Sequence, residues 1–465
     1  MGIRLSEHKS FFIRLRQLDI EISDNLEQLS LLDIDFEKYS NITSKAYNNS
    51  SYRFLFEKKE DAYEIKADYC IGIDWLGQTG KYLYVEPKIN NVSIQSFINK
   101  LESEDDSSFE EANALNKPYE LDYLNMLLQV TSVAESNQEV QDLVQIDWKA
   151  DQISIEQKDD KLTPFLVIRF LQALKSIVRK GLKKNYYKVQ ENLNNRVKGK
   201  ILVGQNIKQN IFKNRLTSTF CEYQVFGEDH LENRFLKKVL KFVISYVENN
   251  RVLLSDNYNI IQQTINYCRP TFELISDDIK ETELKHIKYN PFYREYKDAL
   301  QIGSHILKRF AYNITQTSEQ RVTTPPFWID MPRLFELYVF SKMMEDNPLS
   351  KKEIHYQFST YGNSLDILVS ESENQMVIDA KYKLHYNTGH LHNDIRQVAG
   401  YARLNKVREK LKVTDDTNID CLIIYPDMEL GETDLSLENI NNKKQEIKAY
   451  HKVYKLGVKL PLIGN

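Results

Sequence analysis

The sequence predicts an α+β protein of several domains, with a β-rich N-terminal domain (residues 1–115), a mostly helical middle domain (116–320) and a C-terminal α/β domain (321–465). Three observations support this fold class. With 465 residues the chain is too long for one ordinary hydrophobic core. Short runs of aromatic and β-branched residues dominate its first part, and apolar residues recur every three or four positions in its second. In the last part the two patterns alternate, which is typical of helices layered on a sheet.

The composition excludes several classes of protein. Hydrophobic residues make up 42% and charged residues 28% of the chain, the balance of a globular protein. The apolar runs are far shorter than the roughly 20 residues that a membrane span needs, and the N-terminus lacks the apolar core of a secretory signal. The four cysteines are scattered without a CxxC pair, which predicts neither disulfides nor a structural zinc site. We therefore expect a cytoplasmic protein with no membrane partner.

The first domain is predicted to contain strands at residues 52–56, 62–67 and 81–85, separated by turn-forming residues. The acidic, polar stretch at residues 102–111 indicates an exposed linker or loop. Gly77-Gln-Thr-Gly-Lys81 is the nearest string to a phosphate-binding P-loop, but its spacing is wrong and Tyr82 stands where Ser or Thr would bind Mg²⁺. This string is predicted to be a β-turn.

The middle domain shows helical periodicity in two places. Phe165, Ile168, Leu171, Leu174 and Val178 form one apolar face, and a second helix follows Asp229. Between these helices, residues 171–200 hold nine Lys or Arg against one acid. An ordinary solvated face and a surface for DNA or a partner both fit this segment, although the net charge of the whole chain is −4. The candidate contact residues are Arg179, Lys180, Lys183 and Lys184.

The last domain begins after Thr323-Thr-Pro-Pro326, a sequence that interrupts regular structure. The patterns that follow predict, in order, a helix (331–344), three strands (354–359, 365–369 and 376–382), a helix (394–411) and a strand (420–425).

Two acids and a lysine in this domain form a candidate catalytic group. Asp379 and Lys381 are two residues apart, so in a strand they lie on one face of the sheet. The polar stretch at 370–375 predicts a hairpin that would bring Asp366 beside Asp379. Gln397 and Tyr401 are four residues apart on the next helix and share a face that could look back at this group. The alternative is an Asp-x-Lys pair that forms only a surface ion pair.

Such a group is suited to metal-assisted hydrolysis of a phosphodiester. Carboxylate oxygens hold Mg²⁺, which polarises a phosphoryl oxygen and lowers the pKa of an attacking water. A neighbouring lysine can orient that water and stabilise developing charge. By contrast, His385, His390 and His392 occupy a polar loop without a convincing fourth ligand, and we expect a solvated loop there rather than a zinc site.

The chain resembles the McrC nuclease subunits of McrBC-type restriction systems, including the LlaJI-like ones, in the PD-(D/E)xK superfamily. The most specific motifs are Phe327-Trp-Ile-Asp-Met-Pro-Arg-Leu-Phe-Glu-Leu-Tyr-Val339, Leu365-Asp366, Ile378-Asp-Ala-Lys-Tyr-Lys383 and Asp394-Ile-Arg-Gln-Val-Ala-Gly-Tyr-Ala402. Earlier matches are Phe170 to Leu182, Val197-Lys-Gly-Lys-Ile201 and Asn233-Arg-Phe-Leu-Lys; Tyr69-Cys-Ile-Gly-Ile73 and Val85-Glu-Pro-Lys88 match more weakly. Leu365 stands where the superfamily name expects Pro, but proline supplies no ligand.

The resemblance implies a role for each residue. Asp366 and Asp379 would hold Mg²⁺, with Mn²⁺ as an alternative ion, and Lys381 would position the water. Glu336 and Gln397 would support the metal or the DNA.

The resemblance also implies partners. These are double-stranded DNA and a hexameric AAA+ GTPase like McrB, which recognises modified DNA, docks on the N-terminal domain and is stimulated by the subunit. Since this chain has no P-loop, that motor must be another polypeptide. Dimerisation through the nuclease domain is left open. Two other functions also stay open: a stand-alone nuclease or resolvase, and a non-catalytic adaptor that only activates a GTPase.

Overall fold

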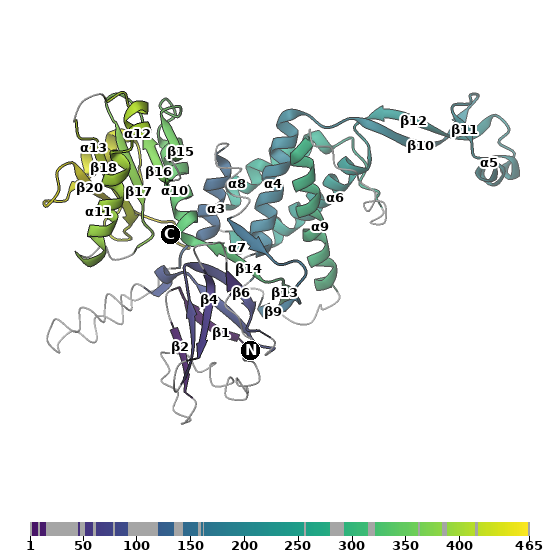
Figure 1. The fold of residues 1–465 in the computed structure, drawn as a ribbon. Helices are drawn as coiled ribbons and strands as arrows, with labels where there is room; N and C mark the ends of the chain where they lie inside the picture. The colour runs from purple at the N-terminus through teal and green to yellow at the C-terminus, as the bar shows by residue number, and fades with distance from the viewer. Residues whose placement is uncertain are drawn as a thin grey trace. The chain divides into compact units, whose positions relative to one another are not determined.

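The computed structural model describes residues 2–7, 10–14, 45–46, 52–58, 62–77, 80–91, 120–133, 143–156, 160, 162–254, 257–279, 293–314, 321–360, 363–383, 388–413 and 417–463. The chain forms two compact units, one made of residues 1–155 and 323–465 and the other of residues 156–322. Each contains both helices and strands, so the protein is an α+β fold as predicted (Figure 1). The acidic stretch at 102–111 lies outside the described residues.

A five-stranded sheet forms the N-terminal part of the first unit. Its strand order is β1-β7-β6-β14-β8. Strand β1 is parallel to β7, and the other three pairs of neighbouring strands are antiparallel. The strands are β1 (Gly2–Ser6), β6 (Cys70–Trp75), β7 (Tyr82–Glu86), β8 (Val144–Ile146) and β14 (Phe327–Asp330). Strands β6 and β7 pair antiparallel, and the Leu76 amide donates to the Lys81 carbonyl over 2.9 Å, as the predicted turn at Gly77-Gln-Thr-Gly-Lys81 requires; Gln78 and Thr79 themselves lie outside the described residues.

A second, antiparallel sheet in the order β2-β5-β4-β3 accompanies the first. Its strands are β2 (Ser10–Arg14), β3 (Lys45–Ala46), β4 (Tyr52–Lys58) and β5 (Ala62–Ala67). Phe54 and Ile65 from this sheet pack with Leu83 and Trp328 from the first in one buried cluster. Two short elements complete this part of the unit, the 3-10 helix η2 (Lys88–Asn91) and the helix α3 (Tyr123–Ser132).

The observed division differs from the three domains expected from the sequence. Strand β14 comes from the predicted C-terminal domain, yet it lies between β6 and β8 of the N-terminal sheet. Helix α3 comes from the predicted middle domain but packs against α10 (Met331–Asp346), which follows β14 directly. Sheet pairing between residues more than 250 positions apart leaves no local signal, so sequence patterns alone could not assign these elements.

A six-stranded sheet forms the C-terminal part of the first unit, in the order β15-β16-β17-β18-β20-β19. Strands β15, β16 and β17 form an antiparallel meander, and β17, β18 and β20 run parallel. The strands are β15 (Ile354–Thr360), β16 (Asn363–Val369), β17 (Met376–Ala380), β18 (Asp420–Pro426), β19 (Gln445–Glu446) and β20 (Val453–Val458). The helices after α10 are α11 (Thr388–Ala402), α12 (Asn405–Lys410) and α13 (Leu437–Lys443).

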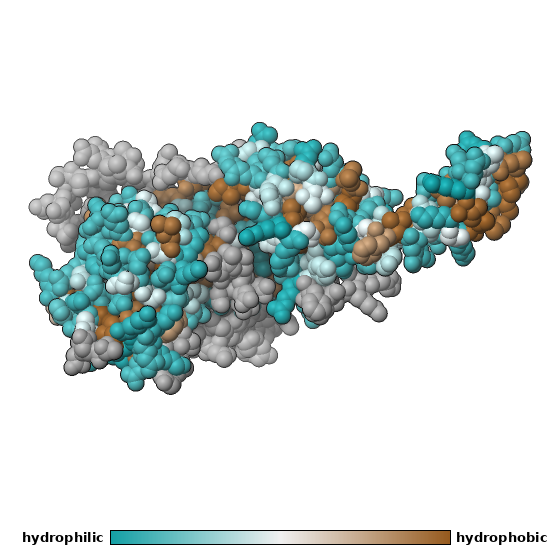
Figure 2. Space-filling view, turned by 90° about the horizontal axis from the view of Figure 1, so that it is seen from above, coloured by the Kyte–Doolittle hydropathy of each residue, from teal (hydrophilic) through white to brown (hydrophobic). Residues whose placement is uncertain are grey.

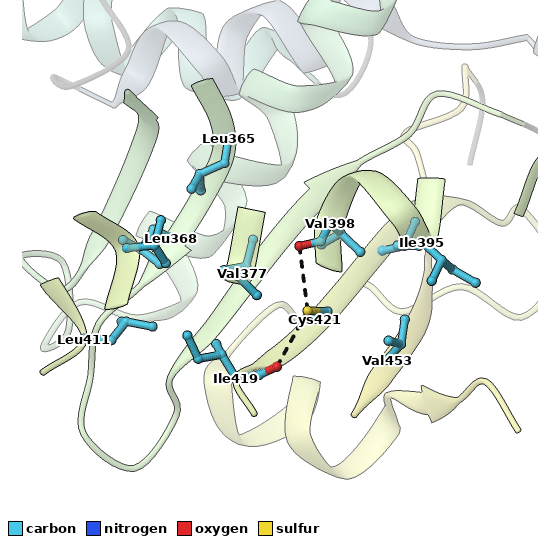
Figure 3. Packing of buried hydrophobic residues seen from close by; sticks show 12 residues of the cluster. Leu365, Leu368, Val377, Ile395, Val398, Leu411, Ile419, Cys421 and Val453 are labelled. Atoms are coloured by element: carbon cyan, nitrogen blue, oxygen red, sulfur yellow. Dashed lines mark hydrogen bonds between the residues drawn. The ribbon is translucent and has the colours of Figure 1, made fainter. Parts of the chain in front are cut away.

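Apolar residues fasten α11 to this sheet. Ile395 and Val398 lie over Val377 of β17 and Cys421 of β18, and the Cys421 thiol contacts the Val398 carbonyl (Figure 3). The single helix predicted for 394–411 is divided in two, because Leu404 adopts an extended conformation. This packing fixes the distance between the end of β17 and the polar face of α11.

The second unit is a helical bundle with a projecting β-structure. Its helices are α4 (Leu162–Lys180), α6 (Leu231–Asn249), α7 (Arg251–Leu254), α8 (Tyr258–Cys268), η8 (Arg269–Phe272) and α9 (Arg294–Ile314). Helix α4 packs on α8 and α9, and α6 packs on α9. The short strands β9 (Ile153–Glu156) and β13 (Arg321–Thr324) pair where the chain enters and leaves this unit.

The projection, here called the finger, comprises residues 185–227. Strands β10 (Asn185–Asn194) and β12 (Ser218–Gly227) pair along their whole length, and β11 (Lys200–Ile201), α5 (Val203–Gln209) and η6 (Ile211–Lys213) form its tip (Figure 1). The middle domain was expected to be mostly helical, so the finger is an addition to that expectation. Its strands mix aromatic and polar residues, and only Leu193 and Cys221 of them are buried, so they lack the buried apolar run by which a core strand is recognised.

Among the described residues, no helix is long and apolar enough to cross a membrane.

Gly72 should be far more sensitive to substitution than Gly80, although both have positive φ angles (+150° and +69°). A Cβ at Gly72 would lie 2.1 Å from the Phe327 carbonyl oxygen, whereas nothing lies within 4 Å of one at Gly80. We expect Gly80→Ala to cost about 1–2 kcal/mol of unfolding free energy from strain alone. Gly72→Ala should cost about 3 kcal/mol or more, because overpacking between β6 and β14 adds to the strain. Urea unfolding measures both, and equal losses would contradict this role for Gly72.

Candidate functional site

The hairpin of β16 and β17 brings Asp366 and Asp379 together. Ile367 of β16 pairs with Ile378 of β17 in an antiparallel arrangement, so Asp366 and Asp379 are the next residues that face each other. The Ala380 amide donates a hydrogen bond of 2.8 Å to Asp366 Oδ2. The predicted hairpin is confirmed, and both carboxylates lie where β17 ends.

Asp379 is the most unusual group of the site. Its side chain is fully buried, and within the described part of the chain neither carboxylate oxygen accepts a hydrogen bond. Oδ2 lies 3.0 Å from Nζ of Lys381. Burial raises the pKa of Asp379 although the Lys381 charge opposes this. A buried carboxylate without hydrogen bonds is costly, and the nearby Lys381 ammonium offsets part of this cost.

Lys381 connects the acids to helix α11. Its ammonium donates a hydrogen bond of 3.0 Å to Gln397 Oε1, and Gln397 Nε2 donates one of 2.9 Å to the Tyr401 hydroxyl. Burial lowers the pKa of Lys381, but the negative charges of Asp379 and, after it, Asp366 more than reverse this and leave the pKa raised. The amine is therefore a fixed cation, held between a carboxylate and an amide.

Glu336 approaches the same site from α10. Burial, then the charges of Asp366 and Asp330, raise its pKa to about 9. Asp330 caps the first turn of this helix by accepting a hydrogen bond of 3.1 Å from the Arg333 amide. The strand β14 ends at Asp330, so the N-terminal sheet determines where α10 starts.

The acids together carry more negative charge than the lysine neutralises. Burial, then the charge of Asp379, raise the pKa of Asp366 to about 7. Hard divalent cations fit such a group, since Mg²⁺ takes one or two carboxylates and fills its other positions with water and phosphate. Among the described residues, no three His, Cys, Asp or Glu side chains are arranged to enclose a metal ion.

Two residues near the site were given no role in the sequence analysis. These residues are Asp394 and Lys383. Asp394 of α11 is buried, accepts hydrogen bonds of 2.9 and 2.7 Å from Nζ of Lys383, and contributes to the raised pKa of Asp379. Each residue lies in one of the family motifs, and this position is the signal in the sequence that could have identified them. The prediction of a polar loop is wrong for His390 and His392, which lie in the first turns of α11. His392 is exposed and bonds to the Tyr450 hydroxyl at 2.7 Å, whereas His385 and the side chain of His390 lie outside the described residues.

The four cations predicted to contact DNA or a partner lie at the end of α4 and the base of the finger. Lys183 is largely buried and donates to both carboxylate oxygens of Glu232 at 3.0 and 2.7 Å. Lys180 pairs with Glu295, and Lys184 lies 3.7 Å from Glu228. Their contact with DNA or a partner stays a prediction, but Lys183 also fastens the finger to α6.

The sequence from residue 84 to 426 matches the profile of the family described as McrBC 5-methylcytosine restriction system component. This match covers more than half of the chain. The protein belongs to the McrBC family. The predicted resemblance to McrBC-type systems is thereby confirmed. The matched region of this McrBC component includes all five candidate site residues, together with the entire finger.

Two solved structures containing similar chains are complexes of Thermococcus gammatolerans. One is titled as a refined half-complex from a tetradecameric assembly of McrB AAA+ hexamers with bound McrC; the match has 15% identity, a TM-score of 0.37 and covers 99% of this chain and 94% of that one. The other is a cryo-EM structure of the McrBC complex, with 14% identity, a TM-score of 0.28 and coverage of 74% and 88%. No curated protein matches the sequence. The assignment to the McrBC family does not depend on the two structures.

Replacing Asp366 with Asn should change the pH dependence of stability in the metal-free protein. The pKa of Asp366 is raised from 3.8 to about 7 in the folded chain, so the wild type loses unfolding free energy as the pH rises from about 4 to about 7. An amide does not titrate, so Asp366→Asn should become progressively more stable relative to wild type across this interval. Urea unfolding in EDTA at several pH values measures the difference; a constant difference would contradict the raised pKa.

Proposed function

We propose that this McrBC component is the McrC-like, metal-dependent DNA endonuclease subunit of its restriction system, with a PD-(D/E)xK site. The observation that supports this most strongly is the convergence of Asp366, Asp379 and Lys381 at the end of β17, where the Asp379 carboxylate is buried and accepts no hydrogen bond in the described chain. An ordinary ion pair on a surface would not bury both partners in this way.

Each side chain has a defined task in this proposal. Asp366 and Asp379 would hold Mg²⁺ or Mn²⁺, which would supply charge stabilisation at the scissile phosphate. The Ala380 amide fixes the orientation of the Asp366 carboxylate. Lys381, held by Gln397, is placed to orient a water molecule and to stabilise negative charge that develops on the phosphate. Glu336, whose pKa of about 9 leaves it protonated at neutral pH without a metal, can donate a hydrogen bond or take up the metal's charge.

We further propose that the subunit works with an AAA+ GTPase like McrB, since the described chain offers a surface suited to a protein partner. At the finger tip, apolar side chains point outward, with exposures of 78% for Phe212, 79% for Leu216 and 63% for Val203 (Figure 2). Its interior is polar instead, because the buried Asn210 bonds to Asn192 and Asn206 at 2.7–2.8 Å. An apolar surface built on a polar interior indicates a binding site, since it adds nothing to the stability of the tip. Docking at the finger would complement the N-terminal docking expected from the sequence.

Asp379→Asn should abolish most DNA cleavage while the protein stays folded. The amide is nearly isosteric but lacks the charge that a metal requires, and loss of about 3 kcal/mol of transition-state stabilisation lowers the rate about a hundredfold or more. Asp420→Asn is the matched control, because Asp420 pairs with Met376 at the opposite end of β17. The cleavage rates of both variants are measured on plasmid DNA with Mg²⁺, the cognate GTPase and GTP.

The same assay separates the alternative functions. The control should cut like the wild type, and both variants should stimulate GTP hydrolysis normally. Cleavage at the wild-type rate by the Asp379→Asn variant would contradict the proposed site. A wild-type chain that stimulates the GTPase yet never cuts would point to the non-catalytic adaptor.

Phe212→Ser combined with Ile211→Ser should weaken GTPase stimulation and partner-dependent cleavage together. Both side chains are exposed at the tip, so their loss should leave the fold intact. Leu430→Ser is the control, since Leu430 is an 84% exposed leucine in the other unit. GTP turnover and cleavage are titrated against GTPase concentration. Efficient cleavage by the wild type without any GTPase would favour the stand-alone nuclease instead.

A further inference from the structure

Lys88 reaches from the N-terminal sheet to the chain segment that carries Lys381. It begins η2, directly after β7, and its ammonium donates a hydrogen bond of 2.7 Å to the backbone carbonyl of Tyr382. The same ammonium lies 4.0 Å from the centre of the Tyr382 ring and 5.7 Å from that of Tyr69. A hydrogen bond and a cation–π contact therefore both hold one residue, which is the neighbour of Lys381.

Glu7 accompanies Lys88 in this buried position. It follows β1, where its amide donates to the Glu86 carbonyl over 3.0 Å, and its Oε2 lies 4.0 Å from Nζ of Lys88. The Glu7 side chain is buried, and neither of its oxygens accepts a hydrogen bond within the described residues. Burial raises the pKa of Glu7 and lowers that of Lys88, in each case to about 8. Buried pairs with so few hydrogen bonds are poor sources of stability, so stability alone does not account for Lys88.

The backbone at residues 381–383, after the end of β17, is held by few hydrogen bonds within the described chain, one of which comes from Lys88. Strand β17 ends at Ala380, beyond which the Lys381 amide still donates to Ile424 and the Lys383 amide turns back to the Lys381 carbonyl, each over 2.8 Å. The Tyr382 carbonyl lies between these two bonds and accepts from Lys88. The Tyr382 ring packs 5.9 Å from Phe335, the residue before Glu336. Lys88 thus fixes the point where the sheet, α10 and the candidate site meet.

We propose that Lys88 is a positioning residue for the site, which holds the backbone at Tyr382 and thereby aims the Lys381 ammonium at the reacting group. This inference rests on the proposed nuclease function. Lys88 acts through the backbone, so its loss should lower kcat and leave the KM for DNA and the affinity for metal nearly unchanged. Displacement of a catalytic group by a fraction of an ångström to about 1 Å costs about tenfold to a hundredfold in rate.

The test compares Lys88→Met with Lys237→Met in the full-length chain. Lys237 is the matched control, because its ammonium also donates to backbone carbonyls, those of Glu273 and Ile275, but in the other unit. Methionine keeps the length of the side chain and removes the donor and the charge. A third protein, Glu7→Gln with Lys88→Met, leaves no buried carboxylate without its cation and serves if the single variant folds poorly.

Three quantities are measured on each folded protein. Steady-state plasmid cleavage with Mg²⁺, the cognate GTPase and GTP gives kcat and KM. Titration calorimetry with Mn²⁺ gives the metal affinity without any reaction. Hydrogen–deuterium exchange of peptides that cover residues 377–383 reports the backbone at the site directly. The wild-type reaction is the reference for all three.

We expect Lys88→Met to lower kcat at least about tenfold and to speed exchange at 381–383, with KM and Mn²⁺ affinity within about twofold of wild type. Lys237→Met should change none of them. Unchanged exchange and kcat in Lys88→Met, or a loss that matches the loss of Mn²⁺ binding, would overturn the positioning role while the nuclease assignment stands. If the wild-type chain with its GTPase does not cleave DNA, the proposed function fails and this inference fails with it.

Discussion

The pairing of β14 with β6 is the interaction on which the rest of the first unit depends. It joins Phe327–Asp330 to Cys70–Trp75, and Gly72 permits it because its missing side chain lets the Phe327 carbonyl approach. Trp328 then fills the core and donates to the buried Asp74 at 3.1 Å. Since α10 starts where β14 ends, this pairing also decides where Glu336 lies. The N-terminal sheet is therefore part of the framework of the candidate site.

The site trades stability for chemistry. Asp379 is buried, Asp366 and Glu336 are half-buried, one cation lies close to Asp379, and burial raises the pKa of each acid. A chain selected for stability alone would place apolar side chains there. The buried apolar layer that α11 shares with β17 and β18 offsets part of this cost and supports the strand that carries Asp379 (Figure 3). Raised carboxyl pKa values above a rigid apolar layer are expected of the divalent-cation site that we propose.

The finger uses the opposite distribution of polarity. Two long, mostly exposed strands carry a tip whose interior is an asparagine network and whose outside is apolar. At its base, Lys183 bonds to Glu232, and its backbone carbonyl accepts from Asn233. Hydrogen bonds that fix the base and exposed apolar side chains at the tip are consistent with the partner binding that we propose for the finger. The candidate catalytic group belongs to the other unit, so the two proposed tasks lie in different units of the chain.

The sequence by itself determined the local features: the hairpin of Asp366 and Asp379, the spacing that puts Lys381 beside them, and the helix that carries Gln397. These follow from patterns within residues 366–401, where periodicity and turn chemistry act directly. The family followed from the resemblance of motifs across most of the chain. Tertiary structure alone decided that β14 joins the N-terminal sheet, that residues 185–227 form a finger, and that Lys88 touches Tyr382. The contacts of β14 and of Lys88 join residues hundreds of positions apart and depend on how whole layers pack, which no local pattern encodes. The finger strands pair locally, but their mostly exposed residues lack the buried apolar run that identifies a core strand.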